Sequence, residues 1–293
     1  MSRQLSVVVT LDGEAHDPEM PLLFADDLAA VRGDGVFETL LVRDGGACLV
    51  ESHLRRLAQS AEMTNLPHPD LATWRHAIEA AVAQWTSVTG DEGALRLVYS
   101  RGRESGSDPT AYLMVSPLAP RVVAARRDGV AALLLERGLP SACVDAMPWL
   151  LAGAKTLSYA VNMAALRHAA GNGAGDVIFV SSDGHILEGP RSTVVVAVEG
   201  EDGRSCLLTP PPWYPILRGT TQQALFEVAR DRGYDCDYRT LRPADLFAAQ
   251  GVWLVSSITL AARVHTLDGR LLMPSALAAE VAELVDTAIL SDR

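Results

Sequence analysis

Lys155 is the only lysine among the 293 residues, although the chain is rich in arginine. Arginine can replace lysine in a salt bridge, but a guanidinium does not lose its proton and attack a carbonyl. A lysine amine that is neutral near pH 7 can form a Schiff base. The surrounding segment, 149–159, is mainly apolar or small, and such surroundings disfavour the charged amine. The single lysine is therefore the first candidate for covalent chemistry.

A Schiff-base lysine suggests pyridoxal phosphate (PLP) as the cofactor. PLP also needs a carboxylate or similar group at its pyridine nitrogen and a cradle for its phosphate. Glu188 lies just before the β-branched run 192–198 and is the candidate carboxylate. Such a carboxylate keeps the pyridine nitrogen protonated, which makes the ring an electron sink.

Three groups of residues are candidates for the phosphate cradle. Thr220 and Thr221 open a predicted helix after a proline-rich loop, and the free N–H groups and dipole of a helix start bind phosphate. Ser256 and Ser257 end a predicted buried strand and add hydroxyl donors. Arg56 offers charge-assisted hydrogen bonds.

Composition restricts the class of protein. The apolar fraction of 48% and the charged fraction of 21% are typical of a soluble globular protein. The net charge of −11 argues against nucleic-acid binding but leaves small anionic substrates possible. The four cysteines are widely spaced, which favours reduced thiols in a cytoplasm over disulfides, and no zinc or other metal site is expected. No apolar run approaches the ~20 residues of a membrane helix.

The chain is long enough for two domains of about 150 residues each. We expect a small α+β domain over 1–118, a linker at 119–125 after a proline-bounded turn, and a larger domain over 126–293. Residues 176–181 and 192–198 are predicted to form a hairpin around the turn 182–184. The other predicted helices and strands are helices at 53–62, 71–88, 158–170, 220–232 and 274–290, and strands at 5–11, 48–50, 94–100, 112–116, 129–135 and 251–256.

Five motifs together resemble one family over nearly the whole chain, from about Val7 to Arg270. They are Gly33-Asp-Gly-Val-Phe-Glu-Thr39, His53-Leu-x-Arg56-Leu, Lys155, Glu188-x-x-x-Ser192 and Gly219-Thr-Thr221. Their order and spacing are similar to those of the class IV aminotransferases, the fold-type IV PLP enzymes. Branched-chain aminotransferase, D-amino acid aminotransferase and 4-amino-4-deoxychorismate lyase belong to this family.

The resemblance implies a fold and a set of roles. The fold would be α+β / α/β, with a small α+β N-terminal domain, a larger pseudo-barrel C-terminal domain and the cofactor between them. The enzyme would be a homodimer whose partner helps to wall the site. The resemblance assigns the family's roles to matching positions of this chain: Lys155 is the Schiff-base lysine and proton shuttle, and Glu188 pairs with the pyridine nitrogen. The other implied cofactor-binding residues are Arg56, Tyr159, Ser192, Thr220, Thr221, Ser256 and Ser257.

The subfamilies differ in how they hold substrate carboxylates. Branched-chain enzymes usually have glycine and arginine where this chain has Thr39 and Leu41, and the Arg-x-His pattern of D-amino acid enzymes is absent. Thr39 fits the lyases and is the third catalytic candidate. Phe37, Arg101 and Arg103 are the candidates for substrate binding.

We therefore expect an aminodeoxychorismate lyase, which releases pyruvate and forms 4-aminobenzoate for folate synthesis. D-amino acid transamination, alone or as a second activity, is the alternative. A PLP-binding protein without turnover, or a module without cofactor, is disfavoured by the complete set of lysine, glutamate and phosphate-binding residues.

Overall fold

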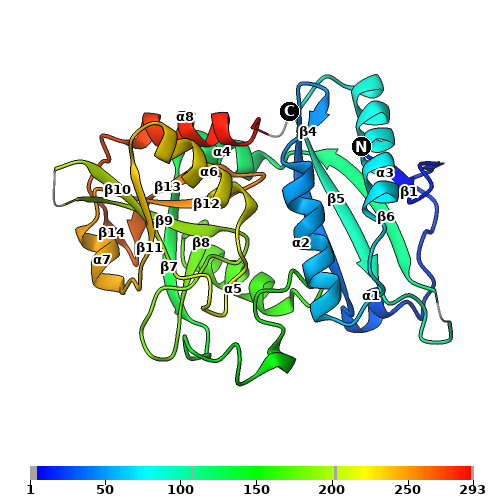
Figure 1. Cartoon of the computed structure of the whole chain (residues 1–293), viewed down its shortest axis with the longest axis horizontal. Coiled ribbons are helices and arrows are strands. Elements are labelled where there is room, and N and C mark those ends of the chain that lie inside the picture. The colour runs from blue at the N-terminus through cyan, green and yellow to red at the C-terminus, as the bar shows by residue number, and fades with distance from the viewer. Residues whose placement is uncertain (1–4, 107, 201–202, 292–293) are drawn as a thin grey trace. The chain divides into compact units, whose positions relative to one another are not determined.

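The structure is a computed structural model that describes residues 5–106, 108–200 and 203–291 (Figure 1). These residues form two compact units, and the chain divides between them after residue 119. The N-terminal unit also contains residues 154–159, so Lys155 belongs to it rather than to the C-terminal unit in which the sequence analysis placed this lysine. Residues 120–128, which include most of the expected linker, form helix α4 of the C-terminal unit.

In the described part of the N-terminal unit, six strands form an antiparallel sheet in the order β2-β1-β6-β5-β3-β4. Side chains of β3 alternate, so that Val36, Glu38 and Leu40 are fully buried on one face, while Phe37 and Thr39 point to the other. The strands are β1 (Val7–Thr10), β2 (Ala15–His16), β3 (Gly35–Arg43), β4 (Gly46–Ala47), β5 (Gly93–Ser100) and β6 (Thr110–Pro117).

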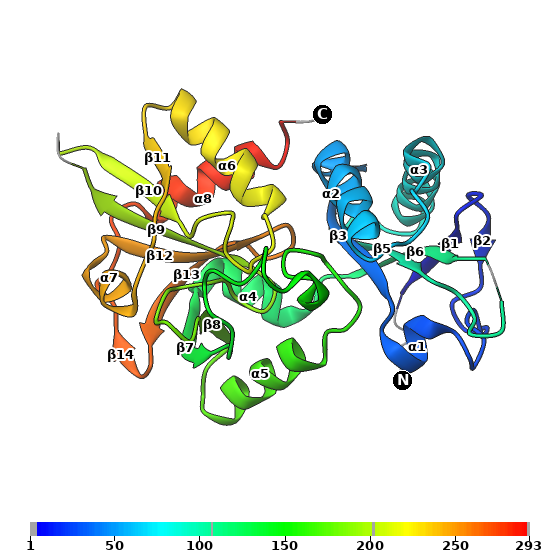
Figure 2. The same cartoon turned by 60° about the horizontal axis from the view of Figure 1, so that its bottom comes forward.

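Helices α2 (Val50–Met63) and α3 (Leu71–Val88) lie side by side over the buried face of this sheet (Figure 2). The bounds of α3 match the predicted 71–88, and Asp70 caps its first turn. The strand predicted at 48–50 is wrong, because Val50 already begins α2. The apolar residues of α2 recur at helical spacing, and their burial outweighs the strand propensity of three residues. Helix α1 spans Leu28–Arg32.

In the described part of the C-terminal unit, eight strands form a mixed sheet in the order β11-β10-β9-β12-β13-β7-β8, with β14 beside β13. The terminal strands β11 and β8 do not pair with each other in this sheet, as expected of a pseudo-barrel rather than a closed barrel. The strands are β7 (Val130–Glu136), β8 (Asp176–Val180), β9 (Thr193–Glu199), β10 (Ser205–Thr209), β11 (Asp235–Tyr238), β12 (Gly251–Ser256), β13 (Leu260–Leu267) and β14 (Arg270–Leu271).

The helices of this unit cover the sheet, and α6 and α8 pack against each other. They are α4 (Pro120–Asp128), α5 (Ala160–Gly171), α6 (Thr220–Asp231), α7 (Pro243–Ala248) and α8 (Ala278–Ala288), with a short 3₁₀ helix at Pro148–Leu150. None of the helices over the described residues is both long and apolar enough to span a membrane.

The predicted hairpin between 176–181 and 192–198 is wrong. Strands β8 and β9 lie far apart in the sheet, and residues 186–188 fold back onto the end of β8 instead. A tight turn at Gly189–Ser192 then redirects the chain into β9. Gly189 and Pro190 end this returning segment, and backbone hydrogen bonds hold Glu188 beside Phe179.

Candidate functional site

Lys155 lies on a segment that pairs with the edge of β3. The Phe37 N–H donates to the Lys155 carbonyl at 3.0 Å, and the Leu157 N–H donates to the Gly35 carbonyl at 2.8 Å. The Lys155 N–H donates to Ser60 Oγ of α2 at 3.1 Å. A Cβ on Gly35 would come within 2.8 Å of Leu157 Cδ1, so the second glycine of the Gly-Asp-Gly motif permits this close pairing. The backbone on both sides of the lysine is thereby fixed to the N-terminal unit.

One aromatic ring lies against the lysine side chain, and a second ring packs on the first. Lys155 Nζ lies 4.5 Å from the centroid of the Phe37 ring. The Tyr159 ring meets the Phe37 ring edge to face, with centroids 5.5 Å apart. The amine is therefore half-buried on the face of β3 that the helices leave open.

Arg56 of α2 is held by a buried carboxylate. Its Nε and Nη2 donate to the two carboxylate oxygens of Glu38 at 2.7 and 2.8 Å, and His53 Nδ1 lies 2.7 Å from the same group. Burial raises the pKa of Glu38, but the charge and hydrogen bonds of Arg56 outweigh it and hold the pKa below its usual range. Burial lowers the pKa of His53 despite the nearby carboxylate, which favours the neutral imidazole. A phosphate contact from Arg56 stays a prediction.

The open face of the sheet carries a cation that the sequence analysis missed. Arg96 of β5 lies directly opposite Thr39 of β3, two pairs along from Phe37 and Val98 and so on the same face of the sheet. Its side chain is exposed, and no carboxylate within the described ranges forms an ion pair with it. Burial raises the pKa of Tyr112, and the positive charge of Arg96 partly opposes that shift. The signal was present in the sequence, since Arg96 alternates with buried leucines in a predicted strand.

The two arginines predicted to bind substrate have carboxylate partners already. Arg101 donates from Nε to Asp34 at 2.7 Å and from Nη2 to the Thr64 carbonyl at 2.7 Å. Arg103 Nε donates to Asp26 at 2.9 Å. Both arginines therefore tie loops of the N-terminal unit together in this structure.

In the C-terminal unit, Glu188 receives a hydrogen bond from the loop before α6. The Leu217 N–H donates to Glu188 Oε2 at 3.0 Å, and the Phe179 N–H donates to the Glu188 carbonyl at 2.8 Å. The loop before α6 holds the Glu188 side chain, and β8 holds its backbone. The half-buried carboxylate therefore has a defined orientation.

Ser192 follows four residues later and has a buried hydroxyl without a hydrogen-bond partner in the described residues. A Cβ on Gly189 would lie only 2.3 Å from this Oγ, so glycine is needed for the tight turn between them. A buried hydroxyl without a partner is costly unless a further group satisfies it.

The start of α6 gathers hydroxyl groups. Thr220 and Thr221 are 5% and 2% exposed, and Thr221 Oγ1 lies 3.2 Å from Ser257 Oγ. Ser256 Oγ accepts the Thr259 N–H at 3.1 Å. No side chain caps this helix and no acidic residue lies in its first turn, which leaves its positive dipole end available to an anion.

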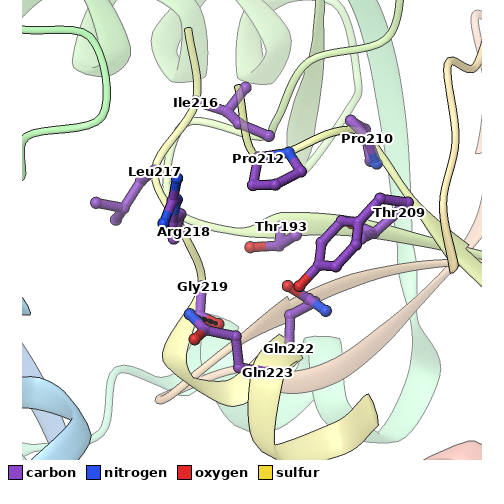
Figure 3. Close-up of a pocket in the computed structure, with 11 residues that line it drawn as sticks. Thr193, Thr209, Pro210, Pro212, Ile216, Leu217, Arg218, Gly219, Gln222 and Gln223 are labelled. Carbon is purple, nitrogen blue, oxygen red and sulfur yellow. Dashed lines mark hydrogen bonds between the residues drawn. The ribbon is translucent and has the colours of Figure 1, made fainter. Parts of the chain in front are cut away.

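A cavity of about 150 Å³ lies beside the start of α6 (Figure 3). Gln222 is 3% exposed, and its Nε2 has no partner in the described part of the chain. Thr220, Thr221 and Ser257, which form the hydroxyl cluster, are not among the residues that line this cavity. The lining residues are Thr193, Thr209, Pro210, Pro212, Ile216, Leu217, Arg218, Gly219, Gln222, Gln223 and Tyr238.

Across the described ranges, no three histidine, cysteine, aspartate or glutamate side chains are arranged to hold a metal ion. The structure brings Lys155, Phe37 and Tyr159 together in the N-terminal unit, and Thr220, Thr221 and Ser257 together in the C-terminal unit.

Comparisons with known proteins identify the family. Residues 35–267 match the family model described as Amino-transferase class IV. A bifunctional aminodeoxychorismate lyase / D-amino acid transaminase from Mycobacterium tuberculosis is 72% identical over 98% of this chain and 100% of its own length.

Two solved structures extend the likeness to the fold. A hypothetical aminotransferase from Mycobacterium tuberculosis in PLP-bound form matches with a TM-score of 0.95 and 72% identity, covering 99% of this chain and 100% of that one. A fold IV transaminase from Curtobacterium pusillum matches with a TM-score of 0.89 and 40% identity, covering 96% of this chain and 99% of that one. The expected fold class is confirmed by these matches.

Proposed function

The chain belongs to the class IV aminotransferase family, and we propose that it is a PLP-dependent enzyme that eliminates pyruvate from 4-amino-4-deoxychorismate to give 4-aminobenzoate. The observation that carries the proposal is the 72% identity, over 98% of the chain, to a relative named for this lyase activity. The same relative is also named a D-amino acid transaminase, which supports amino transfer from D-alanine to 2-oxoglutarate as a second activity of this chain.

The residues of the chain fit PLP chemically. Lys155 offers the one side-chain amine, and Glu188 offers a carboxylate that is oriented by the Leu217 N–H. Ser192 has a buried hydroxyl that lacks a partner in the described residues. The uncapped start of α6 suits a phosphate group, with hydroxyls of Thr220, Thr221, Ser256 and Ser257 nearby. Arg56 and Tyr159 are the further cofactor-binding residues that we propose.

When bound, PLP supplies an electron sink for negative charge that develops on the amine-bearing carbon. We assign the proton transfer to Lys155, whose Nζ accepts the proton from that carbon and returns one later in the reaction. Glu188 holds a proton at the pyridine nitrogen. Phe37, 4.5 Å from Nζ, limits the freedom of the amine and excludes water from one side of it.

Arg96 is the residue best suited to a substrate carboxylate that is not attached to the reacting carbon. It lies on the same sheet face as Phe37, which contacts Lys155 Nζ, and it has no ion-pair partner in the described residues. Arg101 has to give up Asp34 before it can bind a substrate. Thr39, directly opposite Arg96, offers a hydroxyl to the same group. A carboxylate bound by a guanidinium makes short, charge-assisted hydrogen bonds.

We also propose a homodimer in the cytoplasm. Trp149 and Trp213 of the C-terminal unit are 73% and 64% exposed, and large exposed apolar side chains favour burial against a partner. The four cysteines form no disulfide, and three of them are buried, which suits a reducing compartment.

Product analysis tests the proposed function. Purified protein with PLP is supplied with aminodeoxychorismate, and separately with D-alanine and 2-oxoglutarate. We expect 4-aminobenzoate and pyruvate in equal amounts from the first reaction, and pyruvate with D-glutamate from the second. If D-alanine is converted but 4-aminobenzoate never forms, the lyase assignment is wrong and the chain is a transaminase alone.

A further inference from the structure

The turn between β12 and β13 is under backbone strain. Ser256 at the end of β12 pairs with Leu260 at the start of β13, which leaves a three-residue turn at 257–259. Leu260 has φ of 59°, in the left-handed region that bulky residues avoid. Strain of this kind persists only where the surrounding structure holds the backbone in place.

Arg126 of α4 provides such a restraint. Its Nε and Nη2 both donate to the carbonyl oxygen of Ile258, at 2.9 and 2.5 Å. Helix α4 packs against β13, so the guanidinium reaches the turn from an element that is anchored beside it. Two donors of one rigid planar group on one oxygen restrict both the position and the orientation of that peptide.

The restrained turn carries part of the proposed phosphate cradle. Ser257 Oγ lies 3.2 Å from Thr221 Oγ1 at the start of α6, and Ser256 Oγ accepts the Thr259 N–H within the turn. A shift of the Ile258 peptide would therefore move both serine hydroxyls relative to α6. We propose that Arg126 is a positioning residue for the phosphate-binding turn, a role that rests on the proposed use of PLP.

Arg127 offers a matched control on the same helix. It is the next residue, its side chain is 74% exposed, and its guanidinium pairs with Asp128. Arg127→Met removes the same charge from the same turn of α4 without touching the loop at 257–259. A difference between Arg126→Met and Arg127→Met therefore reports the contact to Ile258 rather than a loss of net charge.

The test compares PLP with pyridoxal, which keeps the reactive aldehyde but lacks the phosphate. Dissociation constants for both ligands are measured on the wild type and on the two methionine variants. We expect Arg126→Met to raise the Kd for PLP by about tenfold or more, since a charge-assisted contact to a carbonyl is lost and the cradle loosens. The Kd for pyridoxal should change by less than about twofold, and Arg127→Met should leave both constants unchanged.

A second variant, Arg126→Lys, separates loss of the contact to Ile258 from a general folding defect. Lysine keeps the charge but lacks the planar pair of donors, so we expect a PLP affinity between those of the wild type and Arg126→Met. Equal weakening of PLP and pyridoxal in Arg126→Met, or full recovery of PLP affinity in Arg126→Lys, would overturn the positioning role. A wild type that binds neither ligand would instead overturn the proposed function, so the two failures are distinguishable.

Discussion

Lys155 and the N-terminal α-amine are the only primary amines in the chain, so reduction can attach PLP covalently at only these two positions. We predict that borohydride reduction of the PLP-loaded protein attaches the cofactor to the peptide that contains Lys155. Lys155→Arg should take up no label and should lose both activities, because a guanidinium cannot replace the amine in this chemistry. Peptide mapping by mass spectrometry checks the position. Label on the N-terminal peptide, or activity in Lys155→Arg, would contradict the assignment.

The choice between Arg96 and Arg101 is also decided at single residues. Loss of a charge-assisted carboxylate contact lowers kcat/KM by about tenfold or more. We predict that Arg96→Gln shows this loss with aminodeoxychorismate and with D-glutamate, which carry a second carboxylate, but a smaller loss with D-alanine. Arg101→Gln should affect all three substrates alike, because it breaks the ion pair with Asp34 and loosens its loops. The measurement is kcat/KM for each substrate with both variants.

The reverse pattern, selective loss in Arg101→Gln and uniform loss in Arg96→Gln, would restore Arg101 as the substrate residue that the sequence suggested. The sequence could not decide this point, because it shows residue types but not ion pairs. Asp34 is 67 residues from Arg101 along the chain, and only the fold brings them together. Lys155 stood out in the sequence because it is the only lysine, and Glu188 stood out because it lies in a family motif. Arg96 was only one charge within a predicted strand.

At the scale of elements, the Glu38–Arg56–His53 group joins α2 to β3. The carboxylate is fully buried, so removing its charge takes away the carboxylate that pairs with the buried Arg56 guanidinium. We predict that Glu38→Gln lowers the free energy of unfolding at pH 7 by about 3–5 kcal/mol. Urea unfolding at fixed pH measures the change. Glu51→Gln is the control, because the Glu51–Arg75 pair is about half exposed and is worth at most about 1 kcal/mol.

The Glu38 carboxylate also makes the free energy of unfolding depend on pH, and the sign of that dependence can be predicted. Its folded-state pKa is depressed, so its contribution is fully present above the unfolded value of about 4.3 and is lost as the pH falls towards the folded value. The stability gap between wild type and Glu38→Gln should therefore be constant from pH 7 to about pH 5 and narrow below about pH 4.3. A gap that stays constant down to pH 3 would show that Glu38 has an ordinary pKa.

Elements with a strong local pattern were predicted well. Helix α3 and strand β12 have their predicted bounds, since each combines a clear apolar period with clear end signals. The predicted hairpin between β8 and β9 was wrong, although the turn at 182–184 does form. The segment that returns beside β8 after this turn is short and ends at Gly189, so it is not β9. Pairing of the Lys155 segment with β3 was not foreseeable, since that contact spans more than 110 residues and has no local signal.

At the scale of the whole molecule, the likeness extends over both units, since the relative with both activities covers 98% of the chain. We therefore propose that a single PLP site with one lysine performs both the lyase and the transaminase reaction. Two reactions at one site must compete for it, whichever residues bind the substrates.

The most direct test measures formation of 4-aminobenzoate at increasing concentrations of D-alanine in the presence of 2-oxoglutarate. If one site serves both reactions, D-alanine inhibits the lyase reaction competitively, with an inhibition constant equal to its own KM as a transaminase substrate. Lys155→Arg should lose both activities together. Noncompetitive inhibition, or a lyase rate that D-alanine does not change at concentrations well above its KM, would contradict the claim of a single shared site.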